Sequence, residues 1–93
     1  MTYRLAFLPS AEKEWRKLGE TLRTHFKNKL AKRLLEPRIP GDALHGMPDH
    51  YKIKLRQAGY RLVYRVEDKI LTVVVVAIGK RERGEVYADA KRR

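Results

Sequence analysis

The stretch YKIKLRQAGYRLVY, residues 51–64, decides the fold, because two runs of alternating apolar and polar residues flank a short turn sequence. Successive side chains of a β-strand point to opposite faces, so each run predicts a strand with one apolar face and one charged face. The cations of the segment are Lys52, Lys54, Arg56 and Arg61, with no Asp or Glu among them. The sequence therefore predicts a β-hairpin that presents positive charge on a single face.

The length of the turn decides where Arg61 points. A two-residue loop at residues 58–59 or a four-residue loop at residues 57–60 places Arg61 on the charged face. A three-residue loop would place it among core residues, where an unpaired guanidinium is costly to bury. The expected pairs are Arg56 with Arg61, Lys54 with Val63 and Lys52 with Arg65 on one face, and Leu55 with Leu62, Ile53 with Tyr64 and Tyr51 with Val66 on the other. Because like charges across a hairpin repel each other, the arrangement indicates a site for phosphate.

Two helices are predicted before this hairpin. Residues 3–8 form a strand that Pro9 ends, and Ser10 caps a helix that runs to Gly19. The buried residues of this helix are Ala11, Trp15 and Leu18. A second helix is predicted up to Glu36, before Pro37, because apolar residues recur at every fourth position. Those residues are Leu22, Phe26, Leu30 and Leu34. The two helices form a helical hairpin.

The remaining chain predicts a loop, three strands and a terminal helix. Residues 37–49 form a long loop that Leu44 and Met47 anchor to the core. Strands are expected at residues 51–57, 60–66 and 70–78, and the last is central because it is almost wholly apolar. The expected fold is one α+β domain over residues 1–93, with an N-terminal strand, the helical hairpin, a three-stranded antiparallel meander and a short C-terminal helix.

The charge of the chain points to a polyanionic partner. Lys and Arg number 22 against 11 Asp and Glu, which gives a formal net charge of +11 and favours nucleic acid. An anionic membrane is disfavoured, because the longest apolar stretch, residues 70–78, is far shorter than the ~20 residues of a spanning helix. With no signal-peptide pattern after Met1 and no cysteine, we expect a cytoplasmic protein that does not bind membranes.

Further basic residues lie on the second helix, elsewhere on the hairpin and after the last strand. Those of the second helix could form a binding face for RNA, although a solvated surface is the more common explanation of such charges. We treat all of them as a secondary surface for RNA or the ribosome. The expected surface consists of Arg23, Lys27, Lys29, Lys32, Arg33, Arg56, Arg65, Lys80 and Arg83.

The usual catalytic motifs are absent from the sequence. It has no cysteine, no HExxH, no glycine-rich phosphate loop and no acidic cluster, so we expect neither a metal nor a cofactor. His25, His45 and His50 are spread over a helix and a loop and are interpreted as surface or capping residues. Phosphodiester cleavage without a metal remains possible if the substrate supplies its own nucleophile, the ribose 2′-hydroxyl, and this route restricts the substrate to RNA. A lysine among other cations can act as base, because repulsion lowers its pKa, and arginine suits phosphate binding.

A family resemblance agrees with this interpretation. LHGMPDHYKIKLRQAGYRLVYRV, followed by VVVVAIGKRERGEVYADAKRR, closely resembles the RelE toxins of bacterial and archaeal toxin–antitoxin pairs. The expected order of elements matches that fold over nearly the whole chain. The resemblance implies an endonuclease that cleaves mRNA within the ribosomal A site without a metal.

The resemblance also implies roles for individual residues. Lys52 and Lys54 would supply the base and its cationic support, and Arg61 would stabilise the phosphate. Arg81 of GKRER would act as general acid or stabilise the leaving group, and Tyr87 of EVY would stack on or orient the mRNA base. Taken without the resemblance, Arg81 is interpreted as a charged turn residue and Tyr87 as a packing residue of the last helix.

The implied partners are the 30S A site of the ribosome, mRNA and a RelB-like antitoxin that wraps the toxin. Operator DNA would be bound only indirectly, through the antitoxin. Two alternatives remain open. The first is a ParE-like inhibitor of DNA gyrase, which shares the fold but lacks the Lys/Arg/Tyr set, and the second is a small DNA- or rRNA-binding module.

Overall fold

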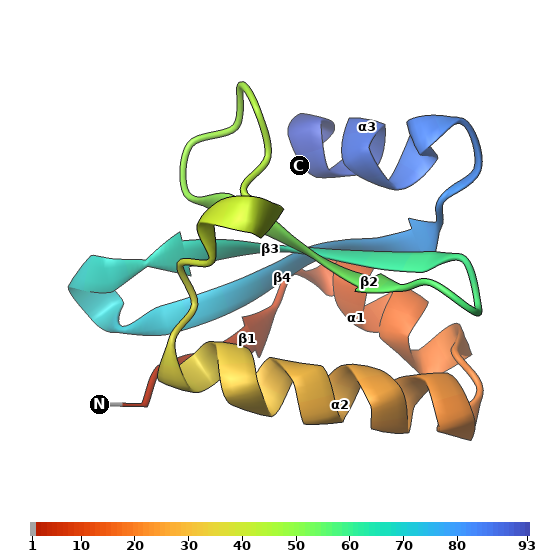
Figure 1. The fold of residues 1–93 in the computed structure, drawn as a ribbon, viewed down its shortest axis with the longest axis horizontal. Coiled ribbons are helices and arrows are strands. Elements are labelled where there is room, and N and C mark those ends of the chain that lie inside the picture. The colour runs from red at the N-terminus through yellow and green to blue at the C-terminus, as the bar shows by residue number, and fades with distance from the viewer. Residues whose placement is uncertain (1) are drawn as a thin grey trace.

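A four-stranded sheet with helices on both faces forms the fold (Figure 1). The structure is a computed structural model that describes residues 2–93, apart from the side chain of Arg83. Its strands and helices are β1 (Arg4–Phe7), α1 (Pro9–Lys17), α2 (Glu20–Leu35), β2 (His50–Leu55), β3 (Tyr60–Glu67), β4 (Thr72–Lys80) and α3 (Glu85–Arg92). Three short 3₁₀ turns span Pro40–Asp42, Asp68–Ile70 and Glu82–Gly84. Within the described residues, no helix has the length and apolar character needed to cross a membrane.

The predicted α+β architecture is confirmed. The strand order is β1-β4-β3-β2, in which β2, β3 and β4 form the antiparallel meander and β1 adds a parallel edge next to β4. Residues 72–78 of β4 are all buried, as expected for a strand in the middle of the sheet. Helices α1 and α2 cover one face of the sheet, and α3 lies on the other (Figure 1).

Two apolar clusters hold these layers together. The larger one joins the helical hairpin to the sheet and includes Phe26, Leu30, Ile53, Leu62 and Tyr64. The smaller one lies under α3 and consists of Val63, Val76, Ala77, Val86 and Ala90. Leu44 and Met47 pack against the smaller cluster, which confirms them as the anchors of the long loop.

The predicted hairpin register is wrong by two residues. Lys54 pairs with Arg61, and Ile53 pairs with Leu62. The turn consists of residues 56–59, so Arg56 belongs to the turn and not to the strand. Gly59 adopts a left-handed φ of 69° and its N–H donates to the carbonyl of Arg56 at 3.3 Å, which closes this four-residue turn. A shift of two residues preserves the faces of both strands, so the charged face is the one expected.

The start and end of α1 also differ from expectation. Leu8 is the N-cap residue and Pro9 begins the helix, which suits a residue with a fixed φ and no N–H to satisfy. Ser10 therefore lies inside the first turn and caps nothing. The helix ends at Lys17, and Gly19 is the N-cap residue of α2.

A β-bulge shapes the sheet edge that positions α3. Val63 pairs with Ala77 while Tyr64 pairs with Val75, so Val76 is the extra residue. Because β1 ends at Phe7, this part of β4 has no neighbouring strand on that side. Glu14 accepts a hydrogen bond from the Ile78 N–H at 3.0 Å, and Arg93 donates to the Val76 carbonyl at 3.0 Å and to Glu14 at 2.8 Å. These bonds tie the end of α3 to α1 across the sheet edge.

Candidate active site

A cationic cleft of about 500 Å³ opens between the β2–β3 hairpin and α3. It contains all five predicted catalytic residues, and none of its described lining residues is acidic. The lining residues are Lys52, Lys54, Arg56, Gly59, Arg61, Arg81 and Tyr87. The two lysines come from β2, Arg61 from β3, Arg81 from the residue after β4 and Tyr87 from α3. The fold thus brings together residues that are up to 35 positions apart in the chain.

Arg61 is the most buried cation of the cleft. It lies directly opposite Lys54 in the hairpin and is only 6% exposed. Its guanidinium donates to the carbonyl of Tyr60 at 3.0 Å, and it forms no salt bridge within the described part of the chain. Burying a guanidinium without an anion costs free energy, so the site favours an incoming anion such as phosphate.

The electrostatics of the cleft act on Lys54. The neighbouring ammonium of Lys52 lowers the pKa of Lys54, and partial desolvation and the charge of Arg56 lower it further. The carboxylate of Asp42 opposes them weakly by raising this pKa. A lowered pKa increases the fraction of neutral amine at a given pH, which is the form that can accept a proton.

A backbone hydrogen bond positions Arg81, and packing under α3 positions Tyr87. The N–H of Arg81 donates to the carbonyl of Gly59 at 2.8 Å, so the chain after β4 is held against the hairpin turn. Tyr87 is half-buried and packs against the apolar cluster under α3. Reasoning from residues alone missed both, because the place of Arg81 depends on its contact with the hairpin turn and that of Tyr87 on how α3 docks. Only the family resemblance indicated them.

Arg33 has a role that sequence reasoning did not find. Its guanidinium donates to Asp42 at 2.6 Å, to the hydroxyl of Tyr64 at 2.9 Å and to the carbonyl of Lys52 at 3.2 Å. The side chain is 17% exposed and lies over the Tyr64 ring. Arg33 is therefore engaged inside the protein, where it joins α2, the long loop and β2, and we remove it from the expected RNA surface.

The other expected RNA-binding residues are divided between several places. Lys27, Lys29 and Lys32 are exposed along α2, and Lys80 is exposed beside Arg81. Arg23 is partly engaged, since it donates to the carbonyl of Leu18 at the end of α1. Arg65 lies outside the cleft, 3.6 Å from Glu67, and does not adjoin the other expected residues. The side chain of Arg83 lies outside the described part of the structure.

The three histidines do not meet in the structure. His25 is on α2, His45 is in the long loop, and the Nδ1 atom of His50 lies 2.8 Å from the carbonyl of Pro48. Among the residues that the structure describes, no group of three or more His, Cys, Asp or Glu side chains is arranged to hold a metal ion.

Comparisons with known proteins point to one family. A family model described as the ParE toxin of the type II toxin–antitoxin system matches residues 5–84. The mRNA interferase toxin RelE of Escherichia coli K12 is 56% identical over 93 residues, which are 100% of this chain and 98% of that protein. A mutant of E. coli RelE in the free state matches with a TM-score of 0.93 at 54% identity, covering 100% of this chain and 98% of the other. The intact E. coli RelBE toxin–antitoxin complex matches with a TM-score of 0.84 at 56% identity. The match covers 87% of this chain and 99% of the matched chain of the complex.

Proposed function

Because the chain belongs to the RelE toxins of the type II toxin–antitoxin family, we propose that it is a ribosome-dependent endoribonuclease that cleaves mRNA in the A site. Cleavage there inhibits translation. The observation that carries this proposal is the gathering of Lys52, Lys54, Arg61, Arg81 and Tyr87 in one cleft. These are the residue types needed to deprotonate a hydroxyl, hold a phosphate and orient a base.

The matching family model bears the name of ParE, so a non-catalytic relative is the natural alternative. The full-length identity of 56% to an mRNA interferase favours the RelE branch. The cleft favours it as well, because a protein that only binds its target does not require a lysine with a lowered pKa beside a buried arginine.

The proposed reaction begins with proton transfer to Lys54. Its neutral amine takes the proton of the ribose 2′-hydroxyl, and the 2′-oxygen attacks the adjacent phosphorus. The bond from phosphorus to the 5′-oxygen breaks, which leaves a 2′,3′-cyclic phosphate on one fragment and a 5′-hydroxyl on the other. Arg61 stabilises the charge that develops on the phosphate, and Arg81 donates a hydrogen bond to the departing 5′-oxygen. That oxygen takes a proton from water to become the 5′-hydroxyl, and the protonated Lys54 returns its proton to the solvent.

The other two residues of the set support this reaction. Lys52 lowers the pKa of Lys54 and adds positive charge near the phosphate. Tyr87 offers its ring to an mRNA base, which places the ribose beside Lys54. Neither lysine nor arginine has an ordinary pKa near neutrality, so the reaction depends on the accurate placement of the strand by the ribosome.

A RelB-type antitoxin is the proposed inhibitor. The RelE of E. coli forms a complex with RelB, and this chain covers 99% of the matched chain of that complex. A net charge of +11 suits an acidic polypeptide that wraps the toxin and competes with RNA. We propose that operator DNA is contacted through the antitoxin and that the toxin acts in the cytoplasm, where ribosomes translate.

The test is primer extension on mRNA in translating ribosomes after addition of the purified protein. We expect cuts within the A-site codon, and their loss when Arg61→Ala replaces the wild type. Arg65→Ala is a matched control, because Arg65 is on the same strand but outside the cleft. Intact mRNA with the wild-type protein would overturn the proposal.

A further inference from the structure

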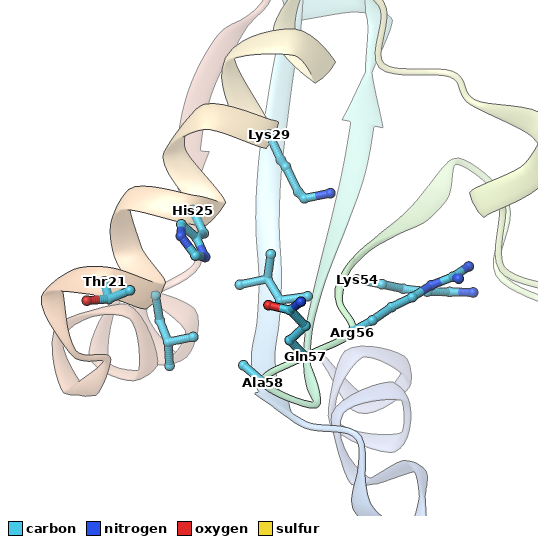
Figure 2. A pocket seen from close by; sticks show the side chains of 9 residues that line it. Thr21, His25, Lys29, Lys54, Arg56, Gln57 and Ala58 are labelled. Atoms are coloured by element: carbon cyan, nitrogen blue, oxygen red, sulfur yellow. The ribbon is translucent and has the colours of Figure 1, made fainter.

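A second hollow adjoins the catalytic cleft, between α2 and the β2–β3 turn (Figure 2). Its volume of about 500 Å³ lies within the range of roughly 300–1,000 Å³ that proteins use for small ligands. We call it the α2 groove. It is lined by Thr21, Leu22, His25, Lys29, Lys54, Leu55, Arg56, Gln57 and Ala58.

The lining of the α2 groove suits a nucleobase. Leu22 and Leu55 supply an apolar surface on which a flat ring can pack. The imidazole of His25 and the amide of Gln57 carry donors and acceptors that suit the edge of a base. Neither side chain forms a hydrogen bond to another part of the described chain, so both are available to a ligand.

The positive charge of the groove favours binding of an RNA strand that carries such a base. Lys29, Lys54 and Arg56 contribute positive charge, and no acidic residue occurs among the described lining residues. An acidic peptide could match the same cations, but an RNA strand whose phosphate lies in the adjoining cleft already brings a nucleotide beside this groove. An unpaired nucleotide matches the cations, the apolar surface and the polar edge groups, because it combines a phosphate with a flat base that can pack and hydrogen-bond.

The groove is continuous with the cleft. Lys54 and Arg56 line both hollows. Figure 2 shows His25 and Lys29 on α2, with Gln57 and Ala58 at the turn, while Lys54 and Arg56 extend away from α2. When a phosphate of the RNA strand lies in the cleft, the α2 groove therefore lies beside that strand, on the α2 side of Lys54.

We propose that the α2 groove binds the base of an mRNA nucleotide next to the two nucleotides that flank the cut. This inference rests on the proposed function and deepens it. His25 and Gln57 contact the edge of the base, and Lys29 binds the neighbouring phosphate. The groove would thereby contribute to the choice of the cleaved codon, since it is the part of the site that touches a base outside the reacting pair.

The test combines base deletion with groove variants in single-turnover cleavage on programmed ribosomes. A series of mRNAs carries one abasic nucleotide at each position around the cut. With the wild-type protein, we expect a rate loss of about tenfold at one position outside the reacting pair, the size expected for one stacked base. In His25→Ala/Gln57→Ala the cleavage of intact mRNA falls by a similar factor, and the abasic nucleotide at that position causes no further loss.

The matched control is His45→Ala/Lys69→Ala, which changes two exposed residues that line neither hollow. It should retain the wild-type response at every position. Additive losses at all positions would overturn the inference. A weaker ribosome affinity with an unchanged abasic pattern would assign the groove to rRNA, and a selective loss of RelB-type antitoxin binding would assign it to a protein; either result also overturns the inference.

Failure of the proposed function gives a different result. In that case the wild-type protein leaves every mRNA uncut, whereas failure of the groove assignment leaves cleavage intact and removes only its dependence on the adjoining base. Circular dichroism checks that the variants are folded, which is expected because His25 and Gln57 are exposed.

Discussion

At the scale of single residues, the charges around Lys54 set the pH at which it can act as base. Lys52 contributes most to the lowered pKa of Lys54, and Asp42 opposes it. The base works when neutral, so cleavage should increase with pH up to the pKa of Lys54 and then level off. The position of this rise in the pH profile therefore reports the pKa.

We predict that substitutions at these two neighbours shift the profile in opposite directions. Lys52→Gln removes a repelling charge, so the pKa of Lys54 rises and the profile moves to higher pH. Asp42→Asn removes an attracting charge, so the pKa falls and the profile moves to lower pH. Single-turnover rates on saturated ribosomes across a pH series measure both, with Asp89→Asn on α3 as a control that should not move the profile. Shifts in the same direction would contradict Lys54 as the base.

At the scale of elements, the pair of Arg33 and Asp42 fixes the long loop against α2 and β2. Arg33→Ala removes three hydrogen bonds and leaves the Asp42 carboxylate without its partner. We predict a loss of about 1–3 kcal/mol in the free energy of unfolding, as expected for hydrogen bonds that involve a charged group. Urea unfolding measures this loss, and Lys32→Ala on the exposed face of the same helix should be nearly neutral. Equal midpoints for the two variants would show that the pair contributes no stability.

The contact between Glu14 and Arg93 is a second connection between elements. Glu14 satisfies the Ile78 N–H at the uncovered edge of β4 and binds the guanidinium of Arg93 after α3. We predict that Glu14→Ala increases amide hydrogen exchange at Ile78 by at least about tenfold and lowers protection in α3. Glu12→Ala is the control, because Glu12 pairs only with the exposed Arg16 within the described structure. Unchanged exchange at Ile78 would mean that the carboxylate does not hold this edge.

These elements show how far the sequence determines the fold. Strict alternation in β2 predicted the faces of the hairpin, and the apolar run of β4 predicted its central place. The register was missed by two residues, because Gly59 can serve a turn at 56–59 as well as the turns that were expected. A shift of two residues keeps every side chain on the same face of the sheet. For that reason the prediction correctly placed Lys52, Lys54 and Arg61 on one face.

The rest of the site depends on contacts between distant parts of the chain. Tyr87 reaches the cleft because α3 packs on the sheet through Val86 and Ala90, and Arg81 reaches it because its N–H binds the carbonyl of Gly59 in the hairpin turn. A helix of eight residues shows which of its faces is apolar, but not which part of the sheet that face will cover. The pair of Arg33 with Asp42 spans the end of α2 and a proline-rich loop, so no helical spacing marks it in the sequence.

At the scale of the whole molecule, the proposed division of labour separates ribosome binding from chemistry. Lys27 and Lys32 are exposed on α2 and line neither hollow. We predict that Lys27→Ala/Lys32→Ala weakens ribosome association. The slope of the logarithm of the binding constant against the logarithm of salt concentration should become shallower by about 0.7–0.9 for each lost phosphate contact. The cleavage rate on saturated ribosomes should stay unchanged. If that rate fell as far as affinity did, α2 would belong to the catalytic machinery.

The whole molecule also determines which atom of the substrate reacts. The cleft offers cations from two strands and their neighbouring turns, and one of these groups serves as the base, while the nucleophile in the proposed reaction comes from the RNA itself. We therefore predict that a 2′-deoxy substitution at the cut nucleotide abolishes cleavage and leaves ribosome-dependent binding intact, since only the attacking oxygen has been removed.

In the unmodified mRNA, the downstream fragment should carry a 5′-hydroxyl and the upstream fragment a 2′,3′-cyclic phosphate or its hydrolysis product. End labelling with and without prior phosphatase treatment distinguishes a 5′-hydroxyl from a 5′-phosphate. Arg61→Ala should lower the rate by about 10²-fold or more without changing these ends, because it weakens phosphate stabilisation and not the choice of nucleophile. A 5′-phosphate on the downstream fragment would mean that water attacks, and the roles given to Lys54, Arg61 and Arg81 would then be wrong.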